Sequence, residues 1–292
     1  MKRLALAFCA ALCIGAGHAE VSVRDDSGIS VTLAAPATRV VSLAPHLTEL
    51  AFAAGGGDAV KAVIRYSDYP ADARALPIVD DAFAIDFEAI ARLKPDLLLV
   101  WRSGLNDRHR ARLRTLGVPV FESEIRSAAA IPETLRRLGV LLGHADEAAQ
   151  AAQRFEQDWQ GLQQRHAGKS ALRVFWQLWR EPLMTVNREH LIGEAITACG
   201  GVNVFAALPL LTPTVGWEAA VAADPQLIAT AGRPADTELD FARWQRFTQV
   251  SAVKHRQFAT LDADLIGRMG PRFVQGAAAL CDAIDRARQV VP

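Results

Sequence analysis

Aromatic and polar side chains gather where three apolar runs of this sequence end. Both tyrosines of the chain, Tyr66 and Tyr69, stand in the segment RYSDYP, Trp101 closes the run LLLVW, and Trp179 closes RVFWQLW. Rings from several loops could form the walls of a cleft for a large ligand that has both apolar and polar surface. Taken singly, each ring has a simpler interpretation as a cap on the edge of the hydrophobic core.

Motifs for covalent catalysis and for phosphate binding are missing from the sequence. No GxSxG or HExxH motif occurs. The string GKS at 168–170 stands at the wrong spacing after Gly161 for a phosphate-binding loop, and it follows a helical segment instead of a strand. We therefore expect neither an enzyme nor a resident cofactor, and we interpret the aromatic loops as a binding site.

One long helix is expected at residues 146–166, DEAAQAAQRFEQDWQGLQQRH. Its apolar side chains recur at steps of three and four residues, namely Ala148, Ala152, Phe155, Trp159 and Leu162. A helix of this length spans roughly 31 Å. The alternative is an ordinary surface helix within one domain, and the flanking sequence decides between the two.

The sequences on the two sides of this helix resemble each other. RVVSLAP, HLTELAFAAGGGDAV and EAIARLKPDLLLV on one side are matched in order by RVFWQLW, HLIGEAITACGGVNV and EAAVAADPQLIAT on the other. Each side has an apolar run, a helix that ends in glycines, and a second helix that stops at a proline before another apolar run. So long a spacing excludes a solenoid and predicts two copies of one α/β unit.

Each copy is expected to be an α/β lobe with a central, mostly parallel sheet flanked by helices. Apolar runs without alternation, such as LLLVW, suit parallel strands that are buried on both faces. The predicted strands of the first copy are Arg39–Leu43, Ala62–Ile64, Leu97–Trp101 and Val118–Phe121. The predicted lobes cover residues 20–145 and 168–292, and one long rigid helix at 146–167 joins them. In such sheets the loops at the carboxyl ends of the strands form the ligand crevice.

The first 19 residues have the pattern of a secretory signal peptide. Lys2 and Arg3 precede a short apolar run, and small residues lead to Ala19, so we expect cleavage after Ala19. The apolar run is too short to span a membrane. The remaining chain has 30 basic and 32 acidic residues, which excludes the strongly basic surface of a nucleic-acid-binding protein. We expect a soluble periplasmic protein.

Two cysteines, Cys199 and Cys281, remain once that segment is removed. In an oxidising compartment they are expected to form a disulfide bond, which the chain-entropy model credits with roughly 4 to 5 kcal/mol for so long a loop. Two buried thiols that do not meet are the alternative.

Four groups of residues carry a family resemblance: RVVSLAPHLTELAFAAG, YSDYP, EAIARLKPDLLLVWRSG, and the pair ACGG with ALCDAI. Together they resemble the periplasmic cobalamin-binding proteins that serve ATP-driven corrinoid importers. The resemblance spans nearly the whole chain after the signal segment and includes the spacing of the two cysteines, which are disulfide-bonded in that family. It implies a substrate-binding protein with a helical backbone that captures a corrinoid in its interlobe cleft.

The resemblance also implies which residues contact the ligand. Tyr66 and Trp101 match positions that contact the corrin ring, and Arg268 in DADLIGRMGPR matches a polar contact from the second lobe. Asp264 of the same segment is a further ligand-binding candidate. Trp179 joins these candidates because it ends an apolar run of the second copy.

This sequence departs from the family pattern at several aromatic positions. A tryptophan of the family falls near Phe83, which is the candidate substitute, and Met184 stands where the family has phenylalanine. Two further tryptophans of the family fall near Leu211 and Thr212 and at Leu265. The aromatic wall is therefore thinner here, which bears on affinity and on which corrinoid is held.

Glu88 and Glu218 occupy equivalent positions at the starts of the second helices of the two copies. Two carboxylates related by approximate twofold symmetry suit a monomer that sits on a twofold-symmetric membrane dimer and meets a basic pocket on each side. The resemblance implies such a partner, the permease dimer of an ABC importer. The alternative is that each glutamate only complements the dipole of its helix.

Two other functions stay open at this stage. A protein of the same fold could hold haem or an iron siderophore, with Tyr66 or His46 as a metal ligand. His46 and His190 begin the duplicated first helices, and each could instead be a helix-start residue with one hydrogen bond. A periplasmic hydrolase is the other possibility, and the missing nucleophile motifs stand against it.

Overall fold

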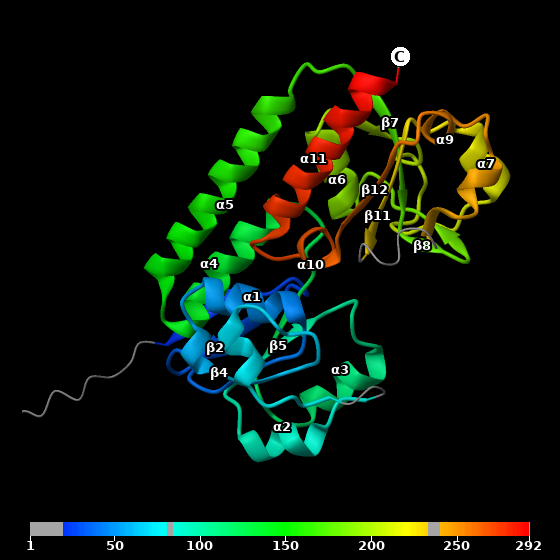
Figure 1. The fold of residues 1–292 in the computed structure, drawn as a ribbon. Coiled ribbons are helices and arrows are strands. Elements are labelled where there is room, and N and C mark those ends of the chain that lie inside the picture. The colour runs from blue at the N-terminus through cyan, green and yellow to red at the C-terminus, as the bar shows by residue number, and fades with distance from the viewer. Residues whose placement is uncertain (1–19, 81–83, 233–239, 292) are drawn as a thin grey trace, which may run out of the picture.

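The computed structural model describes residues 20–80, 84–232 and 240–291, which fold into two lobes (Figure 1). The expected signal segment with its cleavage site after Ala19 and the candidate Phe83 lie outside these residues. In chain order the first lobe contains β1 (Val21–Arg24), β2 (Ser30–Leu33), β3 (Val40–Ser42), α1 (Pro45–Ala53), η1 (Gly57–Ala59), β4 (Val60–Val63), η2 (Ala71–Ala75), α2 (Phe87–Leu93), β5 (Leu97–Trp101), α3 (Asp107–Arg114), β6 (Val120–Ser123) and α4 (Ala130–Leu142). The helix α5 (Ala145–His166) leads into the second lobe, which contains β7 (Leu172–Gln177), β8 (Trp179–Arg180), β9 (Leu183–Met184), α6 (Leu191–Ala198), β10 (Gly201–Asn203), α7 (Trp217–Ala222), β11 (Leu227–Gly232), η4 (Trp244–Arg246), α9 (Ser251–Lys254), β12 (Phe258–Asp262), α10 (Ala263–Ile266) and α11 (Phe273–Val290).

Each lobe is built on a four-stranded parallel sheet, and the two sheets have the same topology. The order is β4-β3-β5-β6 in the first lobe and β10-β7-β11-β12 in the second, so the first strand of each sheet lies between the second and the third. The prediction of two parallel α/β units is thereby confirmed. The predicted strands begin within two residues of the observed ones. β6 starts at Val120 because Pro119 has no N–H to donate to the ladder.

The repeat extends to the turns that precede the third strand of each sheet. Lys94 and Asp224 each stand before a proline and have positive φ angles of 47° and 41°. Two residues further on, Asp96 and Gln226 accept hydrogen bonds from the backbone N–H at the start of their own sheet's first strand, at 2.9 and 3.0 Å. In both turns, a residue with a left-handed backbone conformation follows the second helix, and a side chain two residues later accepts a hydrogen bond from the first strand. These two features align the second helix with the sheet.

The long helix α5 runs beside α4 and α11 and links the two lobes (Figure 1). It begins one residue earlier than predicted, and its buried residues include all five predicted apolar positions, Ala148, Ala152, Phe155, Trp159 and Leu162. Asp146 and Glu147 in its first turn and Arg165 in its last turn complement the helix dipole. Among the described residues, none of the helices combines the length and the apolar character that crossing a bilayer requires.

The hydrophobic core does not divide at the boundary between the lobes. One cluster of buried side chains extends from Leu47 in the first lobe through Phe155 of α5 to Leu280 in the second lobe. The outer faces of the two sheets have separate clusters, one around Leu98 and the other around Phe175. Rotating one lobe against the other would disturb a close-packed core that both lobes share, so we expect only small changes in the angle between them.

Cys199 and Cys281 form the expected disulfide bond, with their Cα atoms 4.8 Å apart. Cys199 directly follows α6, and Cys281 lies in α11. The bond therefore ties the C-terminal helix to the repeated part of the second lobe.

Candidate functional site

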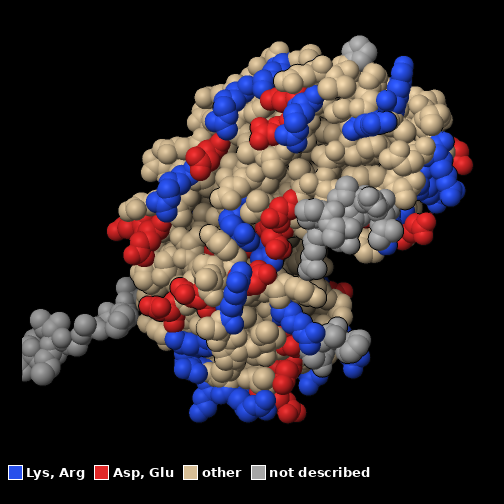
Figure 2. Space-filling view, viewed as in Figure 1, with Lys and Arg blue, Asp and Glu red and all other residues tan. Residues whose placement is uncertain are grey.

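The carboxyl ends of the strands of both sheets meet at the junction between the lobes. Asp68 follows β4 of the first sheet, Arg268 follows β12 of the second, and their side chains approach to 2.7 Å. Figure 2 shows the surface notched between the lobes on the side away from α5, with acidic and basic side chains beside the notch. Tyr66 follows β4, Trp101 ends β5 and Arg268 follows β12 and α10, so these three candidates lie at or beyond the carboxyl ends of strands, which is the usual ligand position in parallel sheets.

Tyr66 and Trp101 are the aromatic candidates of the first lobe. Tyr66 is the third residue after β4, has a φ of 64°, and is 76% exposed. A positive φ is uncommon for a residue with a side chain, and here it accompanies a ring that is held out of the core. Trp101 ends β5 and is half-buried, with its ring centroid 5.5 Å from that of His46. Its indole N–H has no hydrogen-bond partner among the described residues.

Trp179 and Met184 lie opposite each other in the two-stranded pairing of β8 with β9. Trp179 is 61% exposed, and its Nε1 donates to the carbonyl of Glu181 at 2.9 Å, which fixes the ring at the edge of the hairpin. By contrast, Trp176 is fully buried in β7 and belongs to the core. A hollow of about 290 Å³ adjoins the hairpin and is lined by Gln177, Leu178, Trp179, Arg180, Thr230, Ala231, Gly232 and Asp240.

Arg268 lies in an ion-pair cluster that joins the two lobes. Its Nη1 is 3.0 Å from Glu49 and 2.7 Å from Asp68 of the first lobe, and its Nη2 is 2.7 Å from Asp264 of its own lobe. The hydrogen bond from Arg268 is the main cause that holds the pKa of Asp68 below its ordinary value. Only 12% of the Arg268 side chain is exposed. Arg268 thus reaches the cleft, but carboxylates already occupy most of its donors.

Glu49 and Arg272 complete this cluster, and sequence reasoning missed both of them. Glu49 lies in α1 with 1% of its side chain exposed, and it accepts hydrogen bonds from Arg272 Nη2 at 2.6 Å and Nε at 2.9 Å. The guanidinium of Arg272 lies 3.8 Å over the ring of Tyr69. A signal was present, because Glu49 is the one carboxylate in the apolar helix PHLTELAFA and a buried carboxylate needs a basic partner. The sequence did not show which arginine would supply it.

The two histidines of the duplicated helices have different surroundings. His190 precedes α6, and its Nδ1 accepts a hydrogen bond from the Ile192 N–H at 3.1 Å, as a helix-start residue does. His46 lies inside α1, is 4% exposed, and has an Nε2 without a partner among the described residues. Burial lowers the pKa of His46 to about 3 and that of His190 to about 4. His46 could reach a metal in the cleft only if its packing against Trp101 opened.

Glu88 and Glu218 are each the second residue of equivalent helices, α2 and α7, and both are exposed. The Glu88 side chain is 84% exposed, and Arg92 one turn later lies 3.9 Å from it. The shared sheet topology thus presents one accessible carboxylate from each lobe at a corresponding place.

Comparisons with known proteins agree with this architecture. Residues 40–265 match the periplasmic binding protein family. A vitamin B12-binding protein of Vibrio cholerae serotype O1 (strain M66-2) is 35% identical over 254 residues, which are 87% of this chain and 91% of that protein. A vitamin B12-binding protein of Yersinia pestis (strain Pestoides F) is 36% identical over 245 residues, which are 84% of this chain and 85% of that protein.

Solved structures agree on the fold. The crystal structure of a periplasmic vitamin B12 binding protein of Vibrio cholerae matches with a TM-score of 0.78 at 35% identity, over 87% of this chain and 99% of that one. A periplasmic heme-binding protein from Roseiflexus sp. RS-1 has the same fold, with a TM-score of 0.75 at 23% identity, over 85% of this chain and 98% of that one. This chain therefore belongs to the periplasmic binding protein family.

Proposed function

We propose that this protein captures a corrinoid, cobalamin or a relative of it, in the cleft between its lobes and delivers it to an ABC importer. The observation that carries the proposal is the exposure of Tyr66, in the loop after β4 of the first lobe, and of Trp179, in the β8 hairpin of the second, at 76% and 61%. One exposed ring on each side of the cleft leaves apolar surface in contact with solvent, and a large, flat ligand between the rings would cover that surface. The relatives that are named for binding vitamin B12 supply the class of ligand.

The remaining site candidates have places in this proposal. Trp101 and Met184 extend the two walls, and Phe83 stays a candidate on the family resemblance alone. Asp264 and the exposed edge of Arg268 offer polar contacts to the amide side chains at the rim of a corrin. His46 stays a candidate axial ligand, although its burial favours a structural role.

Delivery is assigned to Glu88 and Glu218, which would dock the loaded protein on the permease dimer. Their equivalent positions suit a partner with twofold symmetry. Membership of the family implies a periplasmic location. We propose that the protein is cleaved after Ala19 and acts there as a monomer. Its proposed lobes are residues 20–145 and 168–292, and residues 146–167 connect them. The relatives are named for binding, and the proposal requires no bond to be made or broken by this chain.

Isothermal titration of the mature protein with cyanocobalamin, and separately with hemin, tests the class of ligand. We expect tight one-to-one binding of cyanocobalamin. Binding of hemin alone would move the function to haem capture, with Tyr66 or His46 as the metal ligand. Turnover of generic ester or phosphate substrates by the protein would point to a hydrolase instead.

A further inference from the structure

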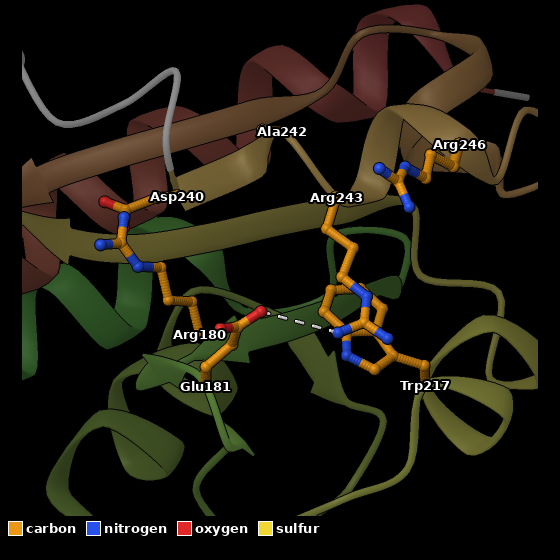
Figure 3. A pocket seen from close by; sticks show the side chains of 7 residues that line it. All are labelled: Arg180, Glu181, Trp217, Asp240, Ala242, Arg243 and Arg246. Atoms are coloured by element: carbon orange, nitrogen blue, oxygen red, sulfur yellow. Dashed lines mark ion pairs between the residues drawn. The ribbon is translucent and has the colours of Figure 1, made fainter.

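A second hollow, which we call the arginine pocket, lies beside the cleft in the second lobe. It has a volume of about 460 Å³ and lies between the β8 hairpin, the start of α7 and η4 (Figure 3). The residues that line it are Arg180, Glu181, Trp217, Asp240, Ala242, Arg243 and Arg246. None of the interactions assigned above to the cleft uses the three arginines.

The charges of the arginine pocket favour an anion. Three guanidinium groups face two carboxylates, and the two ion pairs between them are long: Arg180 to Asp240 at 3.8 Å and Arg243 to Glu181 at 3.7 Å. Within the described part of the chain, the exposed side chain of Arg246 forms no ion pair. Several N–H donors of these arginines therefore have no hydrogen-bond partner among the described residues, and an anion between them would relieve the repulsion of like charges.

Arg243 is oriented in advance by an aromatic stack. Its guanidinium lies 4.4 Å over the ring of Trp217, and Figure 3 shows the two side chains face to face. Trp217 is itself stacked on Phe247 at 5.7 Å and meets the fully buried Trp244 edge-on at 5.0 Å. Because stacking fixes the plane of the guanidinium, its edge can offer two parallel N–H groups to the oxygens of one phosphate.

The arginine pocket adjoins the hollow beside Trp179. Arg180 and Asp240 line both the arginine pocket and the neighbouring hollow that contains Trp179. A ligand whose flat part lies against Trp179 can therefore extend a side arm past Arg180 to Arg243 and Arg246. In cobalamin, the arm that carries the nucleotide contains a phosphodiester with one negative charge, whereas cobinamide lacks this group.

We infer that the arginine pocket binds the phosphate of the captured ligand and so selects phosphate-bearing corrinoids over phosphate-free ones. This inference rests on the proposed function, and it adds a specificity site that lies outside the aromatic walls. Arg246 and Arg243 hold the phosphate oxygens, and Arg180 marks the passage from the cleft to the pocket.

The test is isothermal titration of the full mature protein with cyanocobalamin and with dicyanocobinamide, in the wild type and in the Arg243→Gln/Arg246→Gln variant. We expect the double substitution to raise the Kd for cyanocobalamin about ten-fold, the effect of losing hydrogen bonds to a charged group, and to leave the Kd for dicyanocobinamide unchanged. Arg246→Gln alone keeps the Trp217 stack intact and is expected to give a part of the same selective loss.

The matched control is Arg154→Gln/Arg165→Gln, which removes two exposed arginines of α5 and should change neither Kd. An unchanged cyanocobalamin Kd in both pocket variants, or an equal loss for both ligands, overturns the inference. The inference is also overturned if inorganic phosphate binds to wild type but not to the double variant, while both proteins prefer cyanocobalamin over dicyanocobinamide to the same extent. The pocket would then bind only free phosphate. Failure of wild type to bind either corrinoid would instead overturn the proposed function, and the inference with it.

Discussion

Glu49 of the first lobe and Arg268 of the second lobe, 219 residues apart in sequence, are joined by a hydrogen-bonded ion pair of 3.0 Å at the junction of the lobes. Arg272 binds the same carboxylate, whose side chain is 1% exposed. A carboxylate this buried is tolerated because two guanidinium groups satisfy it. The pair therefore fixes the lobes to each other and holds Arg268 at the edge of the cleft.

We expect Glu49→Ala to lower the free energy of unfolding by about 3 to 5 kcal/mol, because it leaves two largely buried arginines without their shared acceptor. Equilibrium denaturation in urea, followed by tryptophan fluorescence, measures this change. Glu156→Ala is the control, since its ion pair with Arg136 is exposed and should contribute less than about 1 kcal/mol. A loss in Glu49→Ala no larger than in the control would contradict a structural role for the pair.

Helix α6, the counterpart of α1 in the second lobe, also carries a carboxylate that contacts the opposite lobe. Glu194 of α6 accepts a hydrogen bond from the backbone N–H of Ala128, which precedes α4 in the first lobe, at 2.7 Å. Desolvation raises the pKa of Glu194, and the hydrogen bond from Ala128 opposes this shift only in part. A carboxyl with a raised folded pKa stabilises the fold below its ordinary pKa, and this contribution is lost as the pH rises through the folded value.

Glu194→Gln is therefore expected to stabilise the protein relative to wild type at about pH 7, because the amide oxygen still accepts from Ala128 and carries no charge. The difference should shrink as the pH falls toward the ordinary carboxyl range. Urea midpoints of both proteins across the acid range would show this, and a difference that does not vary with pH would refute the assignment.

His46 is predicted to set part of the acid sensitivity of the fold. Its pKa in the folded protein is lowered to about 3 by burial, so its stabilising contribution is present above the ordinary value of roughly 6.5 and is lost as the pH falls toward 3. The slope from this group is at most about 1.4 kcal/mol per pH unit. In His46→Gln the acid limb of a stability profile should be flatter; His190, whose pKa is lowered to about 4, and carboxylates with a lowered pKa such as Asp68 contribute to the limb that remains. An unaltered acid limb would show that His46 does not titrate on unfolding.

The docking proposal predicts a separation of uptake from binding. Substituting both Glu88 and Glu218 by Ala should abolish corrinoid uptake with the cognate permease while leaving the Kd for the ligand unchanged, because both side chains lie on helix starts and are exposed. The control is Glu147→Ala/Glu156→Ala, two exposed glutamates of α5 whose loss should leave uptake intact. Normal uptake by the Glu88/Glu218 variant, or weakened ligand binding, would remove the docking role.

The local and repeated features of this fold were predictable from sequence. The stripe of α5, the two matching halves and the Cys199–Cys281 bond depend on periodicity, on duplication and on a family resemblance, all of which are visible in the printed chain. Trp176 shows the limit of the aromatic argument, because it stands beside Trp179 in the same strand-end segment yet is fully buried.

The contacts between the lobes were not predictable, because they depend on how two units pack in space. As a lone carboxylate in an apolar helix, Glu49 indicates that a basic partner is needed, but nothing in the sequence identifies Arg268 and Arg272 as that partner. The arginine pocket was not predictable for the same reason, since Arg180 lies in β8 and Arg243 directly precedes η4, and only the folded second lobe brings them together. The core that both lobes share depends on the same packing, because side chains of the two lobes meet in one cluster with those of α5.

The central claim is that a corrinoid binds between the aromatic walls of the two lobes, and the most direct test is titration of cyanocobalamin into wild type and into the Tyr66→Ala/Trp179→Ala variant. Both rings are exposed, at 76% and 61%, so their removal should not affect folding. We predict tight one-to-one binding by wild type and a loss of about 10- to 100-fold in the double variant, the combined effect of two stacking rings. Equal affinity in the two proteins would contradict the account.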